Sequence, residues 1–232
     1  MGETPVHFRD ISDLREILDA RFSDDEQVYV AANMFVYYVP GNQLKHVSPD
    51  LFLVRGIDKT KPRRRYLLWE EGKGPDLVIE LTSKSTREED VDKKWLYRDF
   101  LGVKEYVMFD PFAEYLDPQL QGFLLQQGDD ALMPVVSGRL VSQVLGLHLE
   151  ADGEELRLYD PLTGQWLRTP REERAYAAET TAKLNQAASE RDQATSERDQ
   201  ATSERDRALA DNGRLEQELA QLRRRLADMG DK

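Results

Sequence analysis

Two apolar, β-branched segments of the chain each carry one acidic residue in a place where a buried strand would ordinarily have none. Residues 48–54 contain Asp50, and residues 75–84 contain Glu80. An isolated carboxylate is so costly to bury that it is normally neutralised, paired with a base or bound to a metal ion. Because side chains alternate along a strand, one acid from each of two neighbouring strands can converge on one cation. The segments therefore predict two adjacent strands and a hydrolytic metal site at which Asp50 and Glu80 meet.

Lys84 extends this pattern, because it falls on the same side as Glu80 if the second strand continues that far. Several of these residues also have a purely structural interpretation. Asp50 follows a proline and could be an ordinary turn residue, and Lys84 could be a solvated loop lysine. Asp76 shares the face of Glu80 and could help to orient the site, but we favour the simpler interpretation that it caps the strand. Glu16 could add an acid from the first predicted helix, but a solvated position is the simpler interpretation.

The composition narrows the class of protein and of metal. The 232 residues are 40% hydrophobic, which is enough for one sizeable domain and an appendage. There is no cysteine and the three histidines are widely spaced, so neither thiolate ligands nor a local histidine zinc site is expected. Oxygen ligands favour Mg²⁺, with Mn²⁺ as a substitute. No apolar stretch approaches the roughly 20 residues that span a bilayer, and no signal peptide is recognisable, so we expect a cytoplasmic protein without membrane contact.

The net charge of −12 argues against broad, nonspecific binding of nucleic acid, which depends on an excess of lysine and arginine. Any such contact must be local. Residues 59–65 are the one candidate, with five basic residues in seven, and they lie between the two acidic segments. This segment could overhang the site or could be a solvated loop.

The remaining periodicity predicts an α/β fold. In chain order we expect a helix over 10–20, a strand over 28–39, the two acidic strands, a helix over 87–100 and a strand over 103–109. Thr86 and Glu89 have the spacing of a capping box at the start of the second helix. The final strand–helix–strand unit indicates a parallel crossover within a mixed sheet. Residues 112–168 predict further short strands, which either extend the sheet or form a hairpin layer.

A change of character at Thr169 divides the chain into a domain over 1–168 and a charged helix over 169–232. Residues 189–195 and 196–202 are identical copies of one heptad, and residues 203–209 are a diverged third copy. Apolar residues then follow at alternating spacings of four and three, which is the pattern of a coiled-coil seam. Those residues are Leu215, Leu219, Leu222, Leu226 and Met229. We expect a homodimer through this helix; the alternative is a lone helix held by pairs of charges one turn apart.

Several segments together resemble the Uma-type putative restriction endonucleases of the PD-(D/E)XK nuclease superfamily. The resemblance spans roughly residues 10–160 and rests on the order of Ser48-Pro49-Asp50, the segment 75–86, Lys93-Lys94-Trp95-Leu96-Tyr97, Gly102-Val103-Lys104-Glu105-Tyr106 and Phe109-Asp110-Pro111. It implies a restriction-endonuclease-like α/β core with a mixed β-sheet, to which the C-terminal helix is an accessory. It also implies Mg²⁺-dependent hydrolysis of phosphodiester bonds.

Within this resemblance, Asp50 and Glu80 match the two acids that hold the metal. The literal motif has a lysine two residues after the second acid, where this chain has Thr82. Lys84 lies two residues further on, and Lys93 matches a lysine typical of the family. Either could be the catalytic lysine.

The sequence thus predicts a metal-dependent endonuclease that cuts DNA, with duplex DNA as the expected partner. The alternative is a noncatalytic nucleic-acid-binding or scaffold module that keeps the fold and recruits partners through its coil. Thr82 in place of the lysine favours this alternative, whereas the apolar setting of Glu80 favours the enzyme.

Overall fold

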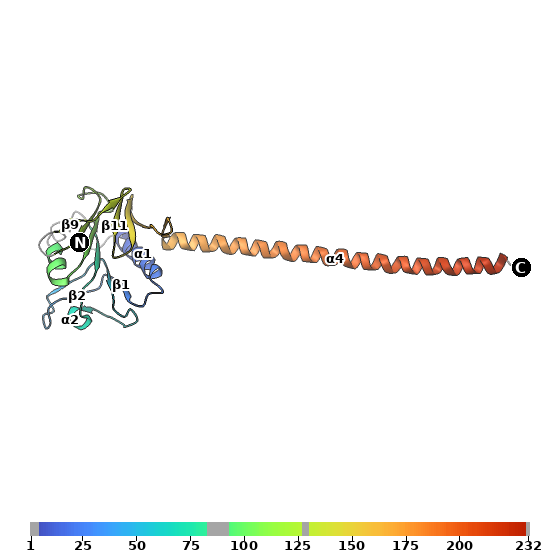
Figure 1. The fold of residues 1–232 in the computed structure, drawn as a ribbon, viewed down its shortest axis with the longest axis horizontal. Helices are drawn as coiled ribbons and strands as arrows, with labels where there is room; N and C mark the ends of the chain where they lie inside the picture. Colours follow the sequence, from blue (N-terminus) through green and yellow to red (C-terminus); the bar gives the residue numbers. More distant parts are fainter. Residues whose placement is uncertain (1–4, 83–92, 127–129, 231–232) are drawn as a thin grey trace. The chain divides into compact units, whose positions relative to one another are not determined.

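A mixed six-stranded sheet forms the centre of the computed structural model, which describes residues 5–82, 93–126 and 130–230 (Figure 1). In spatial order its strands are β1 (Val28–Ala32), β4 (Leu51–Arg55), β6 (Leu77–Leu81), β7 (Glu105–Phe109), β8 (Leu120–Leu124) and β9 (Ala131–Leu132). Only β6 and β7 pair in parallel, and the other neighbours are antiparallel. Parallel neighbours require a crossover of a dozen or more residues, which the chain between these strands supplies. The predicted α/β class, mixed sheet and parallel crossover are confirmed.

The predicted strand over 28–39 is wrong as one element. It breaks at Asn33, where φ is +50° and the N–H donates to the carbonyl oxygens of Pro49 and Asp50. The chain beyond it enters a separate three-stranded sheet. That sheet has the order β3 (His46–Val47), β2 (Val36–Tyr37) and β5 (Tyr66–Leu67), and α2 (Leu68–Glu71) follows it.

Residues 112–168 both extend the central sheet and form a separate hairpin layer, the two outcomes that their pattern allowed. Strands β8 and β9 extend the central sheet, and the rest form an antiparallel five-stranded sheet. Its strands are β10 (Val135–Val136), β11 (Arg139–Ser142), β12 (Leu147–Asp152), β13 (Glu155–Asp160) and β14 (Gln165–Trp166).

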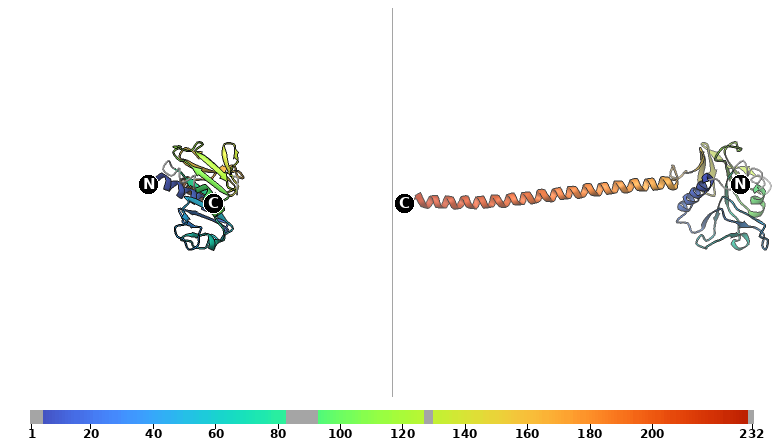
Figure 2. Two further views of the ribbon diagram at one scale, coloured as in Figure 1. Left: turned by 90° about the vertical axis from the view of Figure 1, so that its left-hand side faces the viewer. Right: turned by 180° about the vertical axis from the view of Figure 1, so that it is seen from behind.

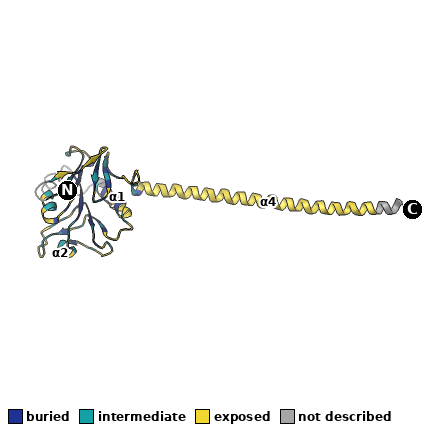
Figure 3. Ribbon diagram, viewed as in Figure 1, coloured by how far each residue is buried: buried dark blue, intermediate teal, exposed yellow. Residues whose placement is uncertain are grey.

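The central sheet has an apolar layer on each face, because every residue of β6 and β7 is buried. Figure 3 shows buried residues within the unit 1–173 and exposed residues along α4. On one face, Leu77, Ile79 and Leu81 of β6 pack in a cluster with α1 (Pro5–Arg21) and the five-stranded sheet. On the other face, Val78 belongs to a cluster that also contains Phe52 of β4. Alternation along β6 therefore assigns Glu80 to the face of Val78.

The segment that covers this second face is helical but irregular. Residues 93–96 are α-helical and continue into the π-helical turn η1 (Tyr97–Leu101), which ends at Gly102 in the left-handed region with φ of +67°. The predicted end of the helix near Gly102 is confirmed. The capping box at Thr86 and Glu89 lies outside the described residues. Single π-turns of this kind occur frequently at functional sites.

The C-terminal part is one long helix, α4 (Pro170–Gly230), shown in two further views in Figure 2. It begins at a capping box: the Glu172 N–H donates to Thr169 Oγ1 at 3.2 Å, and the Thr169 N–H donates to Glu172 Oε2 at 2.8 Å. Proline suits the first helical position because its missing N–H would have no helical partner there. Contacts divide the chain into a compact unit over 1–173 and a second unit over 174–232.

No helix in the described parts of the chain is both long enough and apolar enough to cross a lipid bilayer.

Gly74 is a tightly constrained position that supports the second face. A Cβ atom there would overlap the carbonyl oxygen of Leu101, at the end of η1. We expect Gly74→Ala to lower the free energy of unfolding by about 1–3 kcal/mol, because backbone would have to move. Gly213→Ala is the control, since its added Cβ meets no atom within 4 Å. Thermal unfolding of both variants measures the difference, and an unchanged melting temperature for Gly74→Ala contradicts the prediction.

Candidate active site

Asp50, directly before β4, lies opposite Glu80 of β6. These strands pair antiparallel, with Leu51 facing Ile79, so the next pair outward is Asp50 with Glu80. The Asp50 N–H donates to Glu80 Oε2 at 3.3 Å, and the Leu81 N–H donates to Asp50 Oδ2 at 2.8 Å. The structure thus brings together the two acids that the sequence singled out, on neighbouring strands as predicted.

Glu80 is buried, with 2% of its surface exposed. Its Oε1 accepts a short hydrogen bond from the Tyr97 hydroxyl and lies 3.5 Å from Lys93 Nζ. Burial raises the pKa of Glu80 to about 8, and the neighbouring Asp50 carboxylate adds to the rise, while Lys93, the Tyr97 hydroxyl and the Asp50 N–H oppose it. The pKa of Tyr97 is raised well above its ordinary value because its hydroxyl is buried and lies against Glu80. In the absence of a cation, the surroundings of Glu80 therefore favour its protonated form.

Lys93 and Tyr97 reach Glu80 together because residues four apart share one face of a helix. Lys93 is the predicted lysine that the structure places at the site, with 27% of its side chain exposed. Lys84 lies outside the described residues, so its position stays a prediction. Thr82, which occupies the literal lysine position, is buried, and its Oγ1 donates to the Phe109 carbonyl oxygen at 3.3 Å.

His7 is a member of the site that sequence reasoning missed. It lies in the first turns of α1, and its Nε2 is 3.3 Å from Asp50 Oδ1. The sequence spacing of the histidines predicts no local metal site, and nothing in that spacing signals a contact across 43 residues. Tyr97 is a further member that the sequence pattern did not reveal: it is buried, and its hydroxyl donates to Glu80. Trp95, two residues earlier, is 48% exposed.

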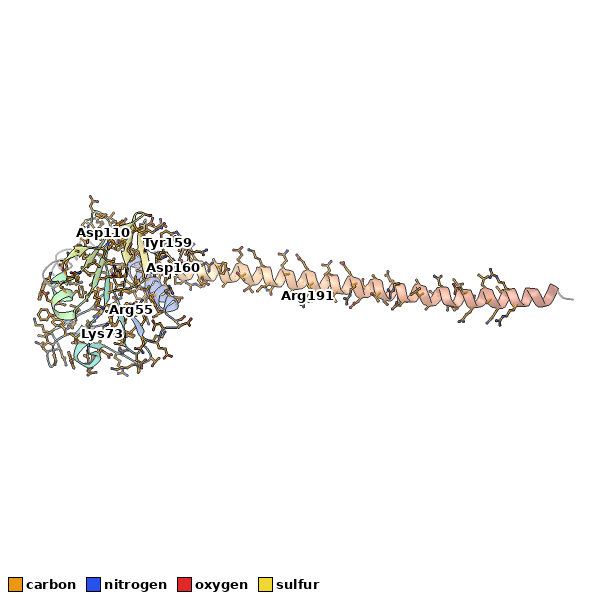
Figure 4. The ribbon with its side chains drawn as sticks, in the orientation of Figure 1. Arg55, Lys73, Asp110, Tyr159, Asp160 and Arg191 are labelled. Atoms are coloured by element: carbon orange, nitrogen blue, oxygen red, sulfur yellow. The ribbon has the colours of Figure 1, made fainter. Side chains whose placement is uncertain are left out.

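Asp76 is another buried acid; it directly precedes β6, at the end of the strand opposite to Glu80. Its Oδ2 accepts from Lys73 Nζ and the Arg55 N–H, both at 2.8 Å, and its Oδ1 lies 2.8 Å from Lys104 Nζ (Figure 4 labels Arg55 and Lys73). Burial raises the pKa of Asp76, but these hydrogen bonds outweigh it, so the pKa is lowered. The interpretation of Asp76 as a structural residue at the strand start agrees with this geometry.

The basic segment 59–65 follows the end of β4 that lies away from Asp50. Its Arg63 donates to Glu71 Oε2 at 2.8 Å, and Lys61 donates to Glu71 Oε1 at 2.8 Å. Lys59 donates to two backbone carbonyl oxygens at 2.6 and 2.8 Å. These contacts hold the loop against the end of α1 and against α2, so the segment does not overhang the carboxylate pair.

The donor set can hold a divalent cation only with help from water or substrate. Among residues 5–82, 93–126 and 130–230, no group of three or more His, Cys, Asp or Glu side chains is arranged to bind a metal. Asp50 and Glu80 supply two carboxylates on one face. That set fits Mg²⁺, which commonly keeps several waters and binds through one or two carboxylates and substrate phosphates.

The chain is similar to one described protein family over most of its length. Residues 1–167 match the profile of the family described as "Uma2: Putative restriction endonuclease". No curated protein matches the chain. Among solved structures, a putative nuclease belonging to DUF820 from Anabaena variabilis ATCC 29413 is 15% identical; the match covers 66% of this chain and 82% of that chain, with a TM-score of 0.48.

The raised pKa of Glu80 predicts how stability depends on pH in the absence of divalent ions. Below the ordinary pKa of 4.5, Glu80 is protonated in both states and contributes no slope. Between 4.5 and about 8 the folded state keeps a proton that the unfolded state has lost. The free energy of unfolding therefore falls as pH rises, by at most about 1.4 kcal/mol per pH unit for one proton.

Glu80→Gln should remove this part of the decline, because its amide does not titrate. Denaturant unfolding between pH 5 and 9 measures it, with Glu154→Gln, at an exposed glutamate, as the control. A slope equal in wild type and Glu80→Gln would show that Glu80 ionises normally in the folded protein.

Proposed function

The chain belongs to the Uma2 family of putative restriction endonucleases, and from this premise we propose that it is a metal-dependent endonuclease that hydrolyses phosphodiester bonds of DNA. The observation that carries the proposal is the buried Glu80 opposite Asp50, with Lys93 Nζ 3.5 Å from Glu80 Oε1. Perturbed carboxylates of this kind concentrate at functional sites. Duplex DNA is the proposed partner, and Mg²⁺, with Mn²⁺ as substitute, is the proposed cofactor.

Asp50 and Glu80 would hold the cation. When bound there, Mg²⁺ would neutralise charge on the phosphoryl oxygens and favour ionisation of the attacking water. The chain's contribution is to keep its carboxylates in place: the Leu81 N–H and His7 orient Asp50, and the Tyr97 hydroxyl orients Glu80. Groups held in advance in this way need little rearrangement during the reaction.

Lys93 is the proposed catalytic lysine among the described residues. Its ammonium group lies beside Glu80 and is partly exposed, so it can also reach a phosphate bound over the carboxylate pair. There it would stabilise the negative charge that develops on the phosphoryl oxygens. Lys84 is the second candidate for this role.

The noncatalytic alternative keeps one specific observation in its favour. Thr82 occupies the position at which the family motif has a lysine, and its hydroxyl donates a hydrogen bond to the Phe109 carbonyl oxygen. A protein of this kind would bind nucleic acid without cutting it, or act as a scaffold that recruits partners through its C-terminal coil.

Nicking of supercoiled plasmid DNA with Mg²⁺ or Mn²⁺ separates the two. We expect the wild type to cut, and Glu80→Gln and Asp50→Asn to lose activity. Glu16→Gln is the control, because Glu16 is an exposed acid of α1 and should leave activity unchanged. DNA binding without cutting by the wild type would support the noncatalytic alternative.

Metal binding has a readout that does not depend on activity. A ligand that binds only the folded state stabilises it by about 2.7 kcal/mol at 100 times its dissociation constant. Mn²⁺ should therefore raise the melting temperature of the wild type, and Glu80→Gln should abolish the rise. Asp76→Asn is the matched control, because it removes a buried acid from the far end of the same segment and should keep the response. Identical Mn²⁺ titrations for wild type and Glu80→Gln would reject the site.

The variants Lys93→Met and Lys84→Met distinguish which of the two lysines is catalytic. The variant that lacks the catalytic lysine should lose kcat by roughly 10²-fold or more while still binding DNA, because charge stabilisation acts in the transition state. Lys94→Met is the control, since Lys94 Nζ lies 3.4 Å from the centroid of the Phe123 ring and not at the carboxylate pair. If both variants cut as fast as wild type, neither lysine has the proposed role.

A further inference from the structure

The helix α4 exposes apolar side chains along its length. Leu184 is 66% exposed, Leu215 is 58% exposed and Leu219 is 50% exposed. The helix is held internally by few strong contacts, such as the Glu179–Lys183 ion pair at 2.7 Å. Such exposed pairs contribute only about 0.2–0.5 kcal/mol each, so a helix of 61 residues gains little stability from them. Burial of the exposed leucines against a partner would stabilise the helix further.

The apolar positions follow one continuous heptad register, abcdefg, through the whole helix. Taking Leu219 as position a and Leu222 as position d, every a and d position back to residue 177 is fixed. The a positions are Ala177, Leu184, Arg191, Arg198, Arg205, Asn212 and Leu219, and the d positions are Thr180, Ala187, Ala194, Ala201, Ala208, Leu215 and Leu222. We call this set the α4 seam.

The repeated heptads place opposite charges next to the α4 seam in a fixed order. In each repeat a glutamate at position g is followed directly by an arginine at position a: Glu190 and Arg191, Glu197 and Arg198, Glu204 and Arg205. In a parallel pair of helices, position g of one chain flanks position a of the other, so each arginine can reach a glutamate of its partner. In an antiparallel pair, g flanks g, and the glutamates would face one another. In the parallel pair each arginine also faces its own copy, and the partner's glutamates offset that repulsion, whereas the antiparallel pair sets glutamate against glutamate without such compensation. The charge pattern therefore favours parallel pairing.

Asn212 points to the same arrangement. In a parallel, in-register pair an asparagine at position a meets its own copy, and the two amides can hydrogen-bond. A single asparagine at such a position specifies register and a two-stranded state, at a cost in stability. In an antiparallel pair it would face a d position, and all d positions of the α4 seam except Thr180 are apolar.

We infer that α4 pairs with α4 of a second copy of this chain in a parallel, in-register, two-stranded coiled coil. The α4 seam has arginine and alanine over most of its length, with leucine layers near its end, so little apolar surface is buried per heptad. The pairing is accordingly concentration-dependent. This inference does not depend on the proposed nuclease activity, and its tests use association alone.

The absence of cysteine from the sequence allows a direct test of polarity and register in the full-length chain. Ala187→Cys introduces a thiol at a d position, where parallel partners bring identical residues face to face. Ser189→Cys introduces one at the outward position f of the same heptad. In a glutathione redox buffer, we expect Ala187→Cys to form a disulfide-linked dimer and Ser189→Cys to remain unlinked.

An antiparallel pair gives a different result. Full overlap of the α4 seam (177–222) in reverse would bring residue 187 of one chain opposite residue 212 of the other, so an equimolar mixture of Ala187→Cys and Asn212→Cys would cross-link as a heterodimer while Ala187→Cys alone would not. That result, or equal cross-linking of Ala187→Cys and Ser189→Cys, overturns the inference. A wild type that sediments as a monomer at every concentration overturns it too.

A charge exchange tests the pairing of g with a. One triple variant replaces the glutamates with lysine (Glu190→Lys, Glu197→Lys and Glu204→Lys), and the other replaces the arginines with glutamate (Arg191→Glu, Arg198→Glu and Arg205→Glu). Each alone places like charges at g and a, so we expect each to sediment as a monomer, whereas their mixture should form a heterodimer. Circular dichroism of each variant checks that the helix is retained. Association of the arginine-replaced variant with itself would show that the arginines do not pair across the seam.

Discussion

The structure depends on the antiparallel register that sets Asp50 against Glu80. Placing two carboxylates side by side at the edge of a buried face is unfavourable, and here it is offset by the Leu81 N–H, the Tyr97 hydroxyl and the Lys93 ammonium group. A slip of β6 by one residue would turn Glu80 to the opposite face and into the leucine-rich layer. The register therefore fixes both the site and the position of the helical segment that covers it.

Asp76 and Glu80 are buried acids at opposite ends of β6, and their different surroundings explain why the first is structural and the second is a candidate for chemistry. Asp76 is matched by two lysines and a backbone N–H, and its pKa is lowered. Glu80 has one ammonium group 3.5 Å away and a second acid beside it, and its pKa is raised to about 8. A divalent cation bound there would supply the positive charge that Glu80 lacks and so favour its ionised form, whereas Asp76 is already paired with two ammonium groups.

Local sequence pattern predicted the parts of this arrangement that local rules determine. Alternation along the strands gave the faces of Asp50 and Glu80, and the apolar run with its acid identified a buried position. Pattern did not reveal His7, because its contact with Asp50 is set by how α1 packs on the sheet. Nor did it reveal the break at Asn33. The positive φ of this residue goes with hydrogen bonds to the chain just before β4, and the valines and tyrosines around it give no sign of that contact.

The two units of the chain obey different physical requirements. The first is built around a buried core, in which a wrong register costs stability directly. In α4 most of the seam is polar or small, so stability gives little discrimination between alternative pairings. Charged and polar residues at seam positions lower the affinity of the matched pair, but they penalise a shifted or reversed pair more. The repeated Glu–Arg heptads disfavour a reversed pair, and Asn212 disfavours a pair shifted by one heptad. Together they favour one alignment at modest affinity, which suits an assembly whose formation follows the concentration of the protein.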